Sequence, residues 1–172
     1  MSQGVRNDPT VEPTEADCWY AAGFIDGEGS ISIRAKNHGR YHPGWSPSWA
    51  ALVEVSQVDP RPLQWLQQRW GGALRQIRRN RTKNERDAWD WIVASKQAYK
   101  FLEDVLPMLM VKQEHAQNAL RLRDLRTGRG YSLPDGTRNR LTEADLSERR
   151  AIYEESRRLV TSRPVWTELP EA

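Results

Sequence analysis

The chain has 172 residues, of which 28% are charged, and its mean hydropathy is −0.80. This length and composition predict one globular domain with a largely solvated surface, and no apolar run reaches the ~20 residues that a membrane-spanning helix needs. The single cysteine, Cys18, excludes an internal disulfide. Because the N-terminus also lacks a hydrophobic signal core, we expect a soluble, intracellular protein.

The N-terminal part begins with a segment, residues 1–13, that has two prolines and no hydrophobic periodicity, so we expect a loose tail there. A helix is predicted over residues 15–26, because Thr14 and Asp17 are spaced almost as in a capping box. Glycines follow this helix at once. Residues 30–37 then alternate between apolar and polar side chains, which predicts a strand.

The C-terminal end of this predicted helix has features that are unfavourable unless they have a purpose. Gly23 lies inside the helix, where it costs roughly 1 kcal/mol relative to alanine. Together with Ala22 and Gly27 it makes a face poor in side chains, on which a second helix could approach closely. Asp26 and Glu28 place two carboxylates at the negative end of the helix dipole. A divalent cation would relieve this accumulation of negative charge.

The nine residues Ala21–Gly29, Ala-Ala-Gly-Phe-Ile-Asp-Gly-Glu-Gly, closely resemble the motif after which the LAGLIDADG homing endonucleases are named. They depart from it by Ala for the first Leu, Phe for the second Leu, Gly for the middle Ala and Glu for the final Asp. The last change keeps a carboxylate, Glu28, so a metal ligand remains. The alternative is an ordinary amphipathic helix that ends in a glycine-rich turn.

The next elements are predicted to be a hairpin and a helix. Residues 30–37 and 49–57 form two strands with one apolar and one mostly polar face, joined by a turn rich in glycine and proline. A twisted ribbon of this kind fits the major groove of DNA. Asp59 and Pro60 then open a helix that ends at Gly71–Gly72, and its tryptophans are expected in the core.

A second pair of strands is predicted over residues 73–79 and 88–95, and basic residues gather in and around it. The net charge is only +3, but the sequence pI is about 9.2 and 21 of the 26 basic residues are arginine. Such a segment is typical of nucleic-acid-binding proteins, with a solvated hairpin as the alternative. Its members are Arg69, Arg75, Arg78, Arg79, Arg81, Lys83 and Arg86.

Three further helices are predicted over residues 96–110 (kinked or ended by Pro107), 112–126 and 142–158, with a loop at 128–141. The order α-β-β-α-β-β-α with extra C-terminal helices predicts an α+β fold in which helices back a four-stranded antiparallel sheet. This is also the order of the LAGLIDADG homing-endonuclease fold. We expect one domain at 14–163, made of a core at 15–126 and a helical extension at 127–163, and a tail at 164–172.

The resemblance implies a metal-dependent enzyme built from two copies of the chain. Only one copy of the motif is present, and single-motif relatives pack their motif helices together at a two-fold axis. The implied homodimer contact consists of Ala22, Gly23, Asp26 and Gly27, with Asp26 in a structural, hydrogen-bonding role. Glu28 and the backbone carbonyl of Gly27 are the implied ligands of Mg²⁺, for which Mn²⁺ would substitute.

Two other residues match catalytic positions of relatives. Gln57 ends the second predicted strand, where relatives often carry a polar residue that orients solvent at the metal. Lys112 lies where relatives carry a lysine that stabilises developing negative charge, although it could equally be a surface lysine at a helix start. Arg61 is a weaker candidate of the same kind. His115 is expected to have a surface or packing role, because the three histidines form no metal-binding cluster.

DNA recognition is expected on the face of the sheet that points away from the core. The register of the third strand is open, so that either Gln76 and Arg78 or Arg75 and Arg79 would face the DNA. The other candidates for contacts with DNA are Ser32, Arg34, Lys36, His38 and Glu54, and Arg61, Arg81, Lys83 and Arg86 are expected at phosphates.

The resemblance thus implies an intron-encoded homing endonuclease that acts as a homodimer with Mg²⁺. Such enzymes make double-strand breaks with short 3′ overhangs in a long pseudo-palindromic site. The alternatives are an RNA maturase that binds intron RNA, a non-catalytic DNA-binding regulator on the same scaffold, and an unrelated α+β protein with a chance motif. The presence of Glu28 favours the endonuclease, since loss of the motif acid would indicate a non-catalytic protein.

Overall fold

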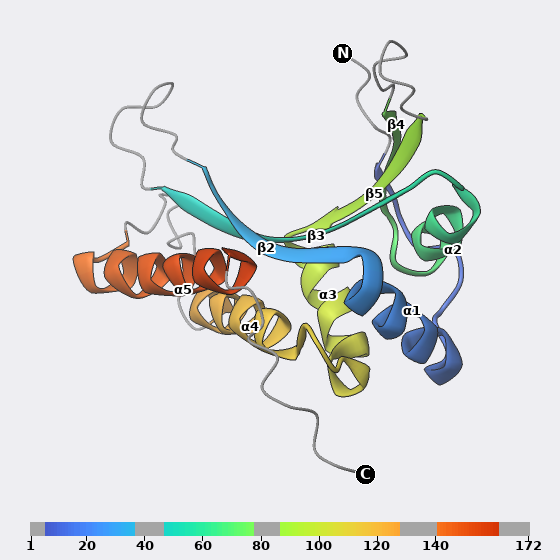
Figure 1. Cartoon of the computed structure of the whole chain (residues 1–172). Coiled ribbons are helices and arrows are strands. Elements are labelled where there is room, and N and C mark those ends of the chain that lie inside the picture. The colour runs from blue at the N-terminus through green and yellow to red at the C-terminus, as the bar shows by residue number, and fades with distance from the viewer. Residues whose placement is uncertain (1–5, 37–46, 78–86, 128–140, 162–172) are drawn as a thin grey trace, which may run out of the picture.

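A computed structural model of the chain describes residues 6–36, 47–77, 87–127 and 141–161. Helices cover one face of a curved antiparallel sheet, and the opposite face is open (Figure 1). The elements are β1 (Arg6–Asn7), α1 (Glu15–Glu28), β2 (Gly29–Lys36), β3 (Ser48–Gln57), α2 (Arg61–Trp70), β4 (Gly72–Ile77), β5 (Ala88–Ala94), α3 (Lys96–Val105), the 3-10 turn η2 (Leu106–Met108), α4 (Gln113–Thr127) and α5 (Glu143–Thr161). The predicted α+β fold and its element order are confirmed.

The sheet has the strand order β1-β4-β5-β3-β2, with antiparallel pairing throughout. Its four long strands are the predicted ones, and the short β1 is an addition. Arg6 pairs with Ala73, and the backbone N–H groups of Thr10 and Val11 both donate to the carbonyl of Gln68. The expectation of a loose tail over residues 1–13 is therefore wrong for residues 6–11, because backbone hydrogen bonds tie them to β4 and α2.

Helix α1 begins with the capping box that the sequence suggested. The Thr14 hydroxyl accepts from the backbone N–H of Asp17 at 3.2 Å, and the Asp17 carboxylate accepts from the backbone N–H of Thr14 at 2.9 Å. This second bond is the main reason why the pKa of Asp17 is lowered. The helix continues through Glu28, two residues beyond the prediction, and β2 starts at Gly29. Glu28 is therefore held between a helix and a strand with no loop.

The main core lies between the sheet and helices α1 to α4. Trp91 and Phe101 are fully buried there. Of the two α2 tryptophans that were predicted in the core, Trp70 is buried and Trp65 is half-buried. Their rings meet edge to face, with Phe101 contacting both tryptophans at centroid distances of 5.1 and 5.3 Å. The indole N–H of Trp91 donates to the carbonyl of Gly71 at 2.8 Å. The large ring of Trp91 is therefore buried with its N–H group hydrogen-bonded.

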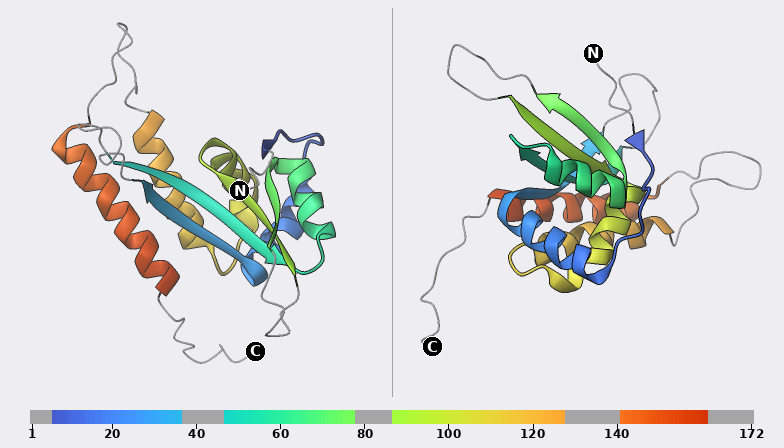
Figure 2. Two further views of the ribbon diagram at one scale, coloured as in Figure 1. Left: turned by 90° about the horizontal axis from the view of Figure 1, so that it is seen from above. Right: turned by 90° about the vertical axis from the view of Figure 1, so that its right-hand side faces the viewer.

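Helices α4 and α5 run side by side beneath β2 and β3 (Figure 2). A second, smaller cluster of buried side chains joins them to the sheet, with Ile33, Trp49, Leu122 and Ile152 as its members. The backbone N–H of Ile33 points out of the edge strand β2 and donates to the hydroxyl of Ser156 at 3.1 Å. The C-terminal helices therefore cover the outer edge of the sheet. No helix among the described residues is long and apolar enough to cross a membrane.

Candidate functional site

Three parts of the chain meet at the C-terminal end of α1. Gly29, directly after this helix, pairs with Val55 of β3, so Gln57 at the end of β3 lies at the same end of the sheet as Glu28. From the other side, the ammonium of Lys112 donates to the carbonyls of Ile25, at 2.8 Å, and of Asp26. The fold thus gathers the three predicted catalytic residues, Glu28, Gln57 and Lys112, at one end of the sheet.

Asp26 has a structural role within the chain. Its carboxylate accepts from the backbone N–H groups of Met110 at 2.7 Å, Val111 at 3.2 Å and Lys112 at 2.9 Å. These bonds attach the segment before α4 to the end of α1. The sequence had placed the hydrogen bonds of Asp26 at the contact between two copies, whereas the structure forms them inside one copy.

Lys112 is held in place and is partly withdrawn from solvent. Burial lowers the pKa of its ammonium, while the nearby carboxylates of Asp26 and Glu28 oppose that shift. The ammonium also lies at the negative end of the α1 dipole, where a cation is favourable. The alternative reading of Lys112 as a free surface lysine does not fit these two carbonyl contacts.

Glu28 is the opposite case, since its side chain is exposed. It makes no hydrogen bond or ion pair with any residue that the structure describes. The described residues also contain no group of three or more His, Cys, Asp or Glu side chains that could hold a metal ion. One carboxylate with a neighbouring backbone carbonyl suits Mg²⁺, which is usually bound by one or two carboxylates together with waters and substrate phosphates.

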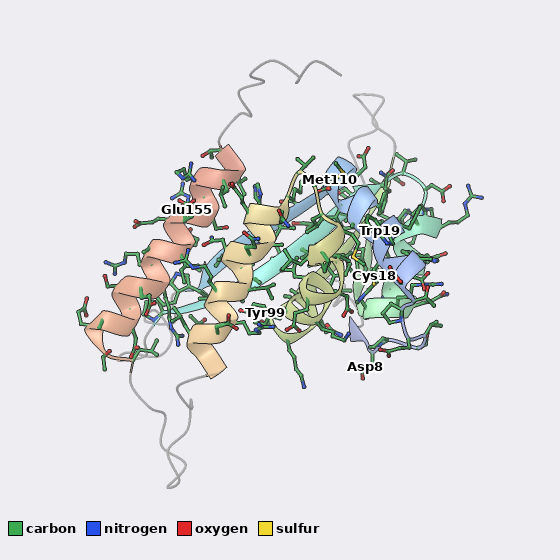
Figure 3. The ribbon with its side chains drawn as sticks, turned by 90° about the horizontal axis from the view of Figure 1, so that it is seen from below. Asp8, Cys18, Trp19, Tyr99, Met110 and Glu155 are labelled. Carbon is green, nitrogen blue, oxygen red and sulfur yellow. The ribbon has the colours of Figure 1, made fainter. Side chains whose placement is uncertain are left out.

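The outward face of α1 is smooth and carries exposed apolar side chains beside it. Gly23 and Gly27 are exposed, and a Cβ added to either would meet no atom within 4 Å beyond the backbone of α1 itself. Trp19, four residues before Gly23 and therefore on the same face of α1, is 56% exposed. Met110 is 88% exposed. Figure 3 shows both side chains beside α1. Ala22, by contrast, is fully buried in the core. It therefore drops out of the predicted contact between copies.

Charged side chains form a network across four strands on the open face of the sheet. Arg34 of β2 donates to Glu54 of β3 at 3.1 Å, and Arg75 of β4 reaches the other oxygen of Glu54 at 3.4 Å. Arg75 also donates to Asp90 of β5 at 2.9 and 3.1 Å, and Ser56 donates to the second oxygen of Asp90 at 2.6 Å. The two arginines are thus oriented by carboxylates of the neighbouring strands.

The register decides which predicted DNA contacts share this face. Arg75 pairs with Asp90 and therefore faces the open side, whereas Gln76 pairs with Trp89 and faces the other side. Of the two options for the third strand, the one with Gln76 is wrong. Ser32, Arg34, Lys36 and Glu54 lie on the open face, as the alternation in β2 and β3 predicted. His38, Arg78, Arg79, Arg81, Lys83 and Arg86 lie outside the described residues.

The contacts of two acidic residues with arginines of the site were not predicted from the sequence. Asp90 was hidden in a strand with apolar residues on both faces, and only its pairing with Arg75 shows its role. Asp59 forms an ion pair with Arg61, whose side chain is 84% exposed. Hydrogen bonds from Arg61 lower the pKa of Asp59 to about 2. Arg61 is therefore oriented by a residue two positions before it.

Solved structures with a similar fold come from homing endonucleases. I-CvuI in complex with its DNA target is 17% identical, with a TM-score of 0.62 over 87% of this chain and 85% of that one. The archaeal intron-encoded I-Vdi141I complexed with DNA is 17% identical, with a TM-score of 0.59 over 91% and 90%. I-TnaI is 18% identical, with a TM-score of 0.54 over 87% and 95%. At these identities the likeness shows the fold.

A comparison of the sequence with curated proteins gives no match. The sequence model of the family described as LAGLIDADG endonuclease, however, matches residues 21–117, which is more than half of the chain. The match begins at the motif and extends to the start of α4, so it contains Glu28, Gln57 and Lys112. The chain therefore belongs to the LAGLIDADG endonuclease family, as its nine-residue motif had indicated.

Proposed function

We propose that this DNA endonuclease acts as a homodimer and cuts both strands of duplex DNA in the presence of Mg²⁺. The observation that carries the proposal is the exposed carboxylate of Glu28, which makes no hydrogen bond or ion pair with the described residues. It lies near the ammonium of Lys112, which is bonded to the carbonyls of Ile25 and Asp26. A free carboxylate at the negative end of a helix is unfavourable on its own. A bound divalent cation would add to the compensation that the nearby ammonium of Lys112 gives.

The homodimer is supported by the motif and by the surface of α1. One chain contains one motif, whereas two strands of DNA require two reacting centres. Open space above Gly23 and Gly27 lets a second α1 approach closely, and exposed Trp19 and Met110 provide apolar area beside it. Two copies joined along this face would bring two Glu28 side chains to the same end of the two sheets.

The chemistry is hydrolysis of a phosphodiester. A bound Mg²⁺ acts as a Lewis acid that stabilises negative charge on the attacked phosphate and makes a bound water more acidic. Glu28 and the carbonyl of Gly27 would hold the ion, and Mn²⁺ would substitute for it. The ammonium of Lys112 would stabilise the charge that develops on the phosphate, and the side-chain amide of Gln57 would orient solvent.

The open face of the sheet would position the DNA. Arg34 and Arg75 are suited to guanine edges or phosphates because each presents a planar fork of donors. A two-fold symmetric dimer would read a pseudo-palindromic site, since each sheet contacts one half of it. Short 3′ overhangs and an intracellular setting are parts of this proposal that rest on the family resemblance.

The test starts from a library of random duplexes, because the target sequence is unknown. DNA bound by the purified protein would be sequenced, and the enriched site would be offered for cleavage with Mg²⁺ or with EDTA. We expect Glu28→Gln to bind the site but to lose at least roughly 10³-fold in cleavage rate. Glu148→Gln, the same change at an exposed position of α5, is the matched control and should cut normally.

Three results would contradict this function. Tight binding of DNA without cutting would indicate a regulator, and tight binding of intron RNA without cutting of DNA would indicate a maturase. Equal cleavage by wild type and Glu28→Gln would remove Glu28 from the reaction. A monomeric protein that cuts both strands would contradict the homodimer.

A further inference from the structure

The exposed face of α1 has a different element on each side. Successive helical residues are turned by about 100°, so Tyr20 lies about 60° to one side of Gly23 and Asp26 about 60° to the other. On the Tyr20 side is α2, whose Trp65 contacts the ring of Tyr20 at a centroid distance of 4.8 Å. On the Asp26 side is the segment before α4, which is bonded to the Asp26 carboxylate through the N–H of Met110. The face centred on Gly23 therefore has two unlike flanks.

The flank on the α2 side contains an apolar hollow. It has a volume of about 310 Å³, is open to solvent and is lined by Tyr20, Pro62 and Trp65. The guanidinium of Arg69 lies over the indole of Trp65, 4.3 Å from the ring centre, and is paired with Asp17 at 2.8 Å. The α1–α2 hollow is therefore built from side chains that their neighbours already hold.

The flank on the other side presents exposed apolar side chains. Met110 and Val111 are both exposed, and their backbone N–H groups are bonded to the carboxylate of Asp26 at 2.7 and 3.2 Å. The side chains thus extend from a backbone that is fixed to the end of α1. Methionine adapts to irregular gaps, and its sulfur makes favourable contacts with aromatic rings. Met110 therefore has the chemistry that an open hollow lined by aromatic rings would bind.

The face of α1 alone is too small to hold two copies together. The helix has 14 residues, so it is about 21 Å long and about 10 Å wide, and its contact face covers roughly 200 Å². A specific interface buries about 800 Å² on each partner. The two flanks must therefore supply most of the contact area of the proposed homodimer.

A two-fold axis along α1 brings the unlike flanks together. The proposed function needs the two Glu28 carboxylates at the same end, so the two α1 helices run parallel with the axis between them. A half-turn about this axis places the Asp26 flank of one copy opposite the Tyr20 flank of the other. In an antiparallel pair of helices, like flanks would face each other instead.

The hollow and the methionine also lie at similar levels along α1. The ring contact and the ion pair of α2 fall at successively earlier residues of α1 as α2 proceeds, so the two helices are antiparallel. Pro62, in the first turn of α2, therefore lies near the level of Gly23. Met110 is bonded to Asp26, which is about 5 Å further along the axis. An extended methionine side chain spans such a difference.

We propose that in the homodimer the α1–α2 hollow of each copy binds the Met110 side chain of the other copy, with Val111 packed at its rim. The proposal rests on the proposed homodimer and specifies its contact. The sulfur of Met110 would lie against the rings of Tyr20 and Trp65. Each dimer would contain two such contacts, one on either side of the paired α1 helices.

Cross-linking of cysteine pairs tests which side chain reaches the hollow. Protein that carries both Pro62→Cys and Met110→Cys is treated with a bismaleimide of short spacer and separated under denaturing conditions. We expect at least roughly 10-fold more covalent dimer than for either single variant, because the two-fold axis keeps identical positions apart. The native Cys18 is buried, so the wild type should give no covalent dimer.

Four results would overturn the contact. Covalent dimers of Met110→Cys alone would show that like flanks meet. Stronger cross-linking of Pro62→Cys with Trp19→Cys than with Met110→Cys would make Trp19 the occupant of the hollow. A protein that is dimeric in sedimentation but gives no cross-link would refute the contact and leave the homodimer intact, whereas a monomer would refute both.

A second test uses charge instead of a cross-linker. Met110→Lys and Pro62→Glu should each weaken dimerisation by roughly 10–100-fold, because each places a charge against apolar surface. In an equal mixture the heterodimer should exceed the statistical expectation, since one contact then pairs lysine with glutamate and the other is native. Met110→Lys mixed with Ala144→Glu, at an exposed position of α5, is the matched control and should show no excess.

The same absence of excess in both mixtures would contradict the proposal. Thermal unfolding of each variant shows whether a weaker dimer reflects loss of the fold. DNA cleavage enters neither test, so a dimer with this contact that fails to cut DNA would refute the proposed endonuclease and retain the contact.

Discussion

The two acids of the motif, Asp26 and Glu28, are two positions apart and lie in opposite environments. Asp26 accepts three backbone N–H groups of the segment before α4, whereas Glu28 is exposed with no partner among the described residues. Two helical positions differ by about 200° around the axis. One carboxylate therefore points into the fold and the other to the end of the sheet.

The difference indicates that the two carboxylates of the motif have separate roles, with Asp26 anchoring the fold and Glu28 proposed as the metal ligand. A carboxylate whose oxygens accept three backbone N–H groups has its hydrogen bonds committed to the protein. An exposed carboxylate with no hydrogen bond or ion pair among the described residues is available to an external cation. Four changes would test this contrast or extend it to the rest of the site.

The largest effect is expected for Asp26→Ala, which should lower the free energy of unfolding by about 2–4 kcal/mol, because it leaves three backbone N–H groups without their acceptor. Urea denaturation measures this difference. Glu28→Ala is the matched control at the exposed position and should change stability by no more than about 0.5 kcal/mol. Equal losses in the two variants would contradict the division into an anchor and a ligand.

Gly23→Leu should separate folding from assembly. The folded monomer has open space at this position, so its stability should stay equal or rise by up to about 1 kcal/mol through higher helix propensity. The same side chain should keep a second α1 at a distance and weaken dimerisation by about 10–100-fold, or ~1.4–2.7 kcal/mol. Sedimentation measures this, with Ala144→Leu on α5 as control. An unchanged dimer would remove α1 from the interface.

On the open face of the sheet, Asp90→Asn should destabilise the protein by about 1–2 kcal/mol, because this carboxylate is only 3% exposed and receives bonds from Arg75 and Ser56. Glu54→Gln should cost less, since both partners of Glu54 are largely exposed and surface ion pairs contribute little. Urea denaturation of both variants gives the comparison. A larger loss for Glu54→Gln would show that the network is centred on Glu54.

The smallest effect concerns the pH dependence of the exposed pair Asp59 and Arg61. Hydrogen bonds from Arg61 lower the pKa of Asp59 from 3.8 to about 2. An acid with a depressed pKa stabilises the folded state above its unfolded value, and this contribution disappears as the pH falls from about 4 towards 2. A carboxyl NMR titration should show the low value, and Arg61→Leu should return it close to 3.8. An unchanged titration would show that the pair does not form in solution.

Much of the fold could be predicted from the sequence because it depends on local patterns. The capping box of Thr14 and Asp17, the alternation in β2 and β3 and the position of Pro107 each act over a few residues. The nine-residue motif adds an indication of the family that the match over residues 21–117 confirms. The position of Glu28 follows from this local information, since helix and strand meet at that residue.

Other features depend on contacts between residues that are distant in the sequence. The inward role of Asp26 requires a segment 84 to 86 residues later, and the open-face position of Arg75 requires the register of β4 against β5. The pairing of residues 6–7 with β4 had no hydrophobic signal at all. Shifting a strand by one residue exchanges its two faces, so composition alone could not choose between Arg75 and Gln76.

What the sequence by itself determined is the set of elements, their order and the carboxylate at the junction of α1 and β2. The residue patterns for helix capping, strand alternation and glycine placement involve only neighbouring residues. They can therefore be recognised in the sequence before the chain folds. Only the tertiary structure decided that Ala22 is buried, that Lys112 contacts the end of α1 and that Asp26 faces into the fold. Burial and hydrogen-bond satisfaction exist only after packing, because they depend on which distant backbone groups arrive beside each side chain.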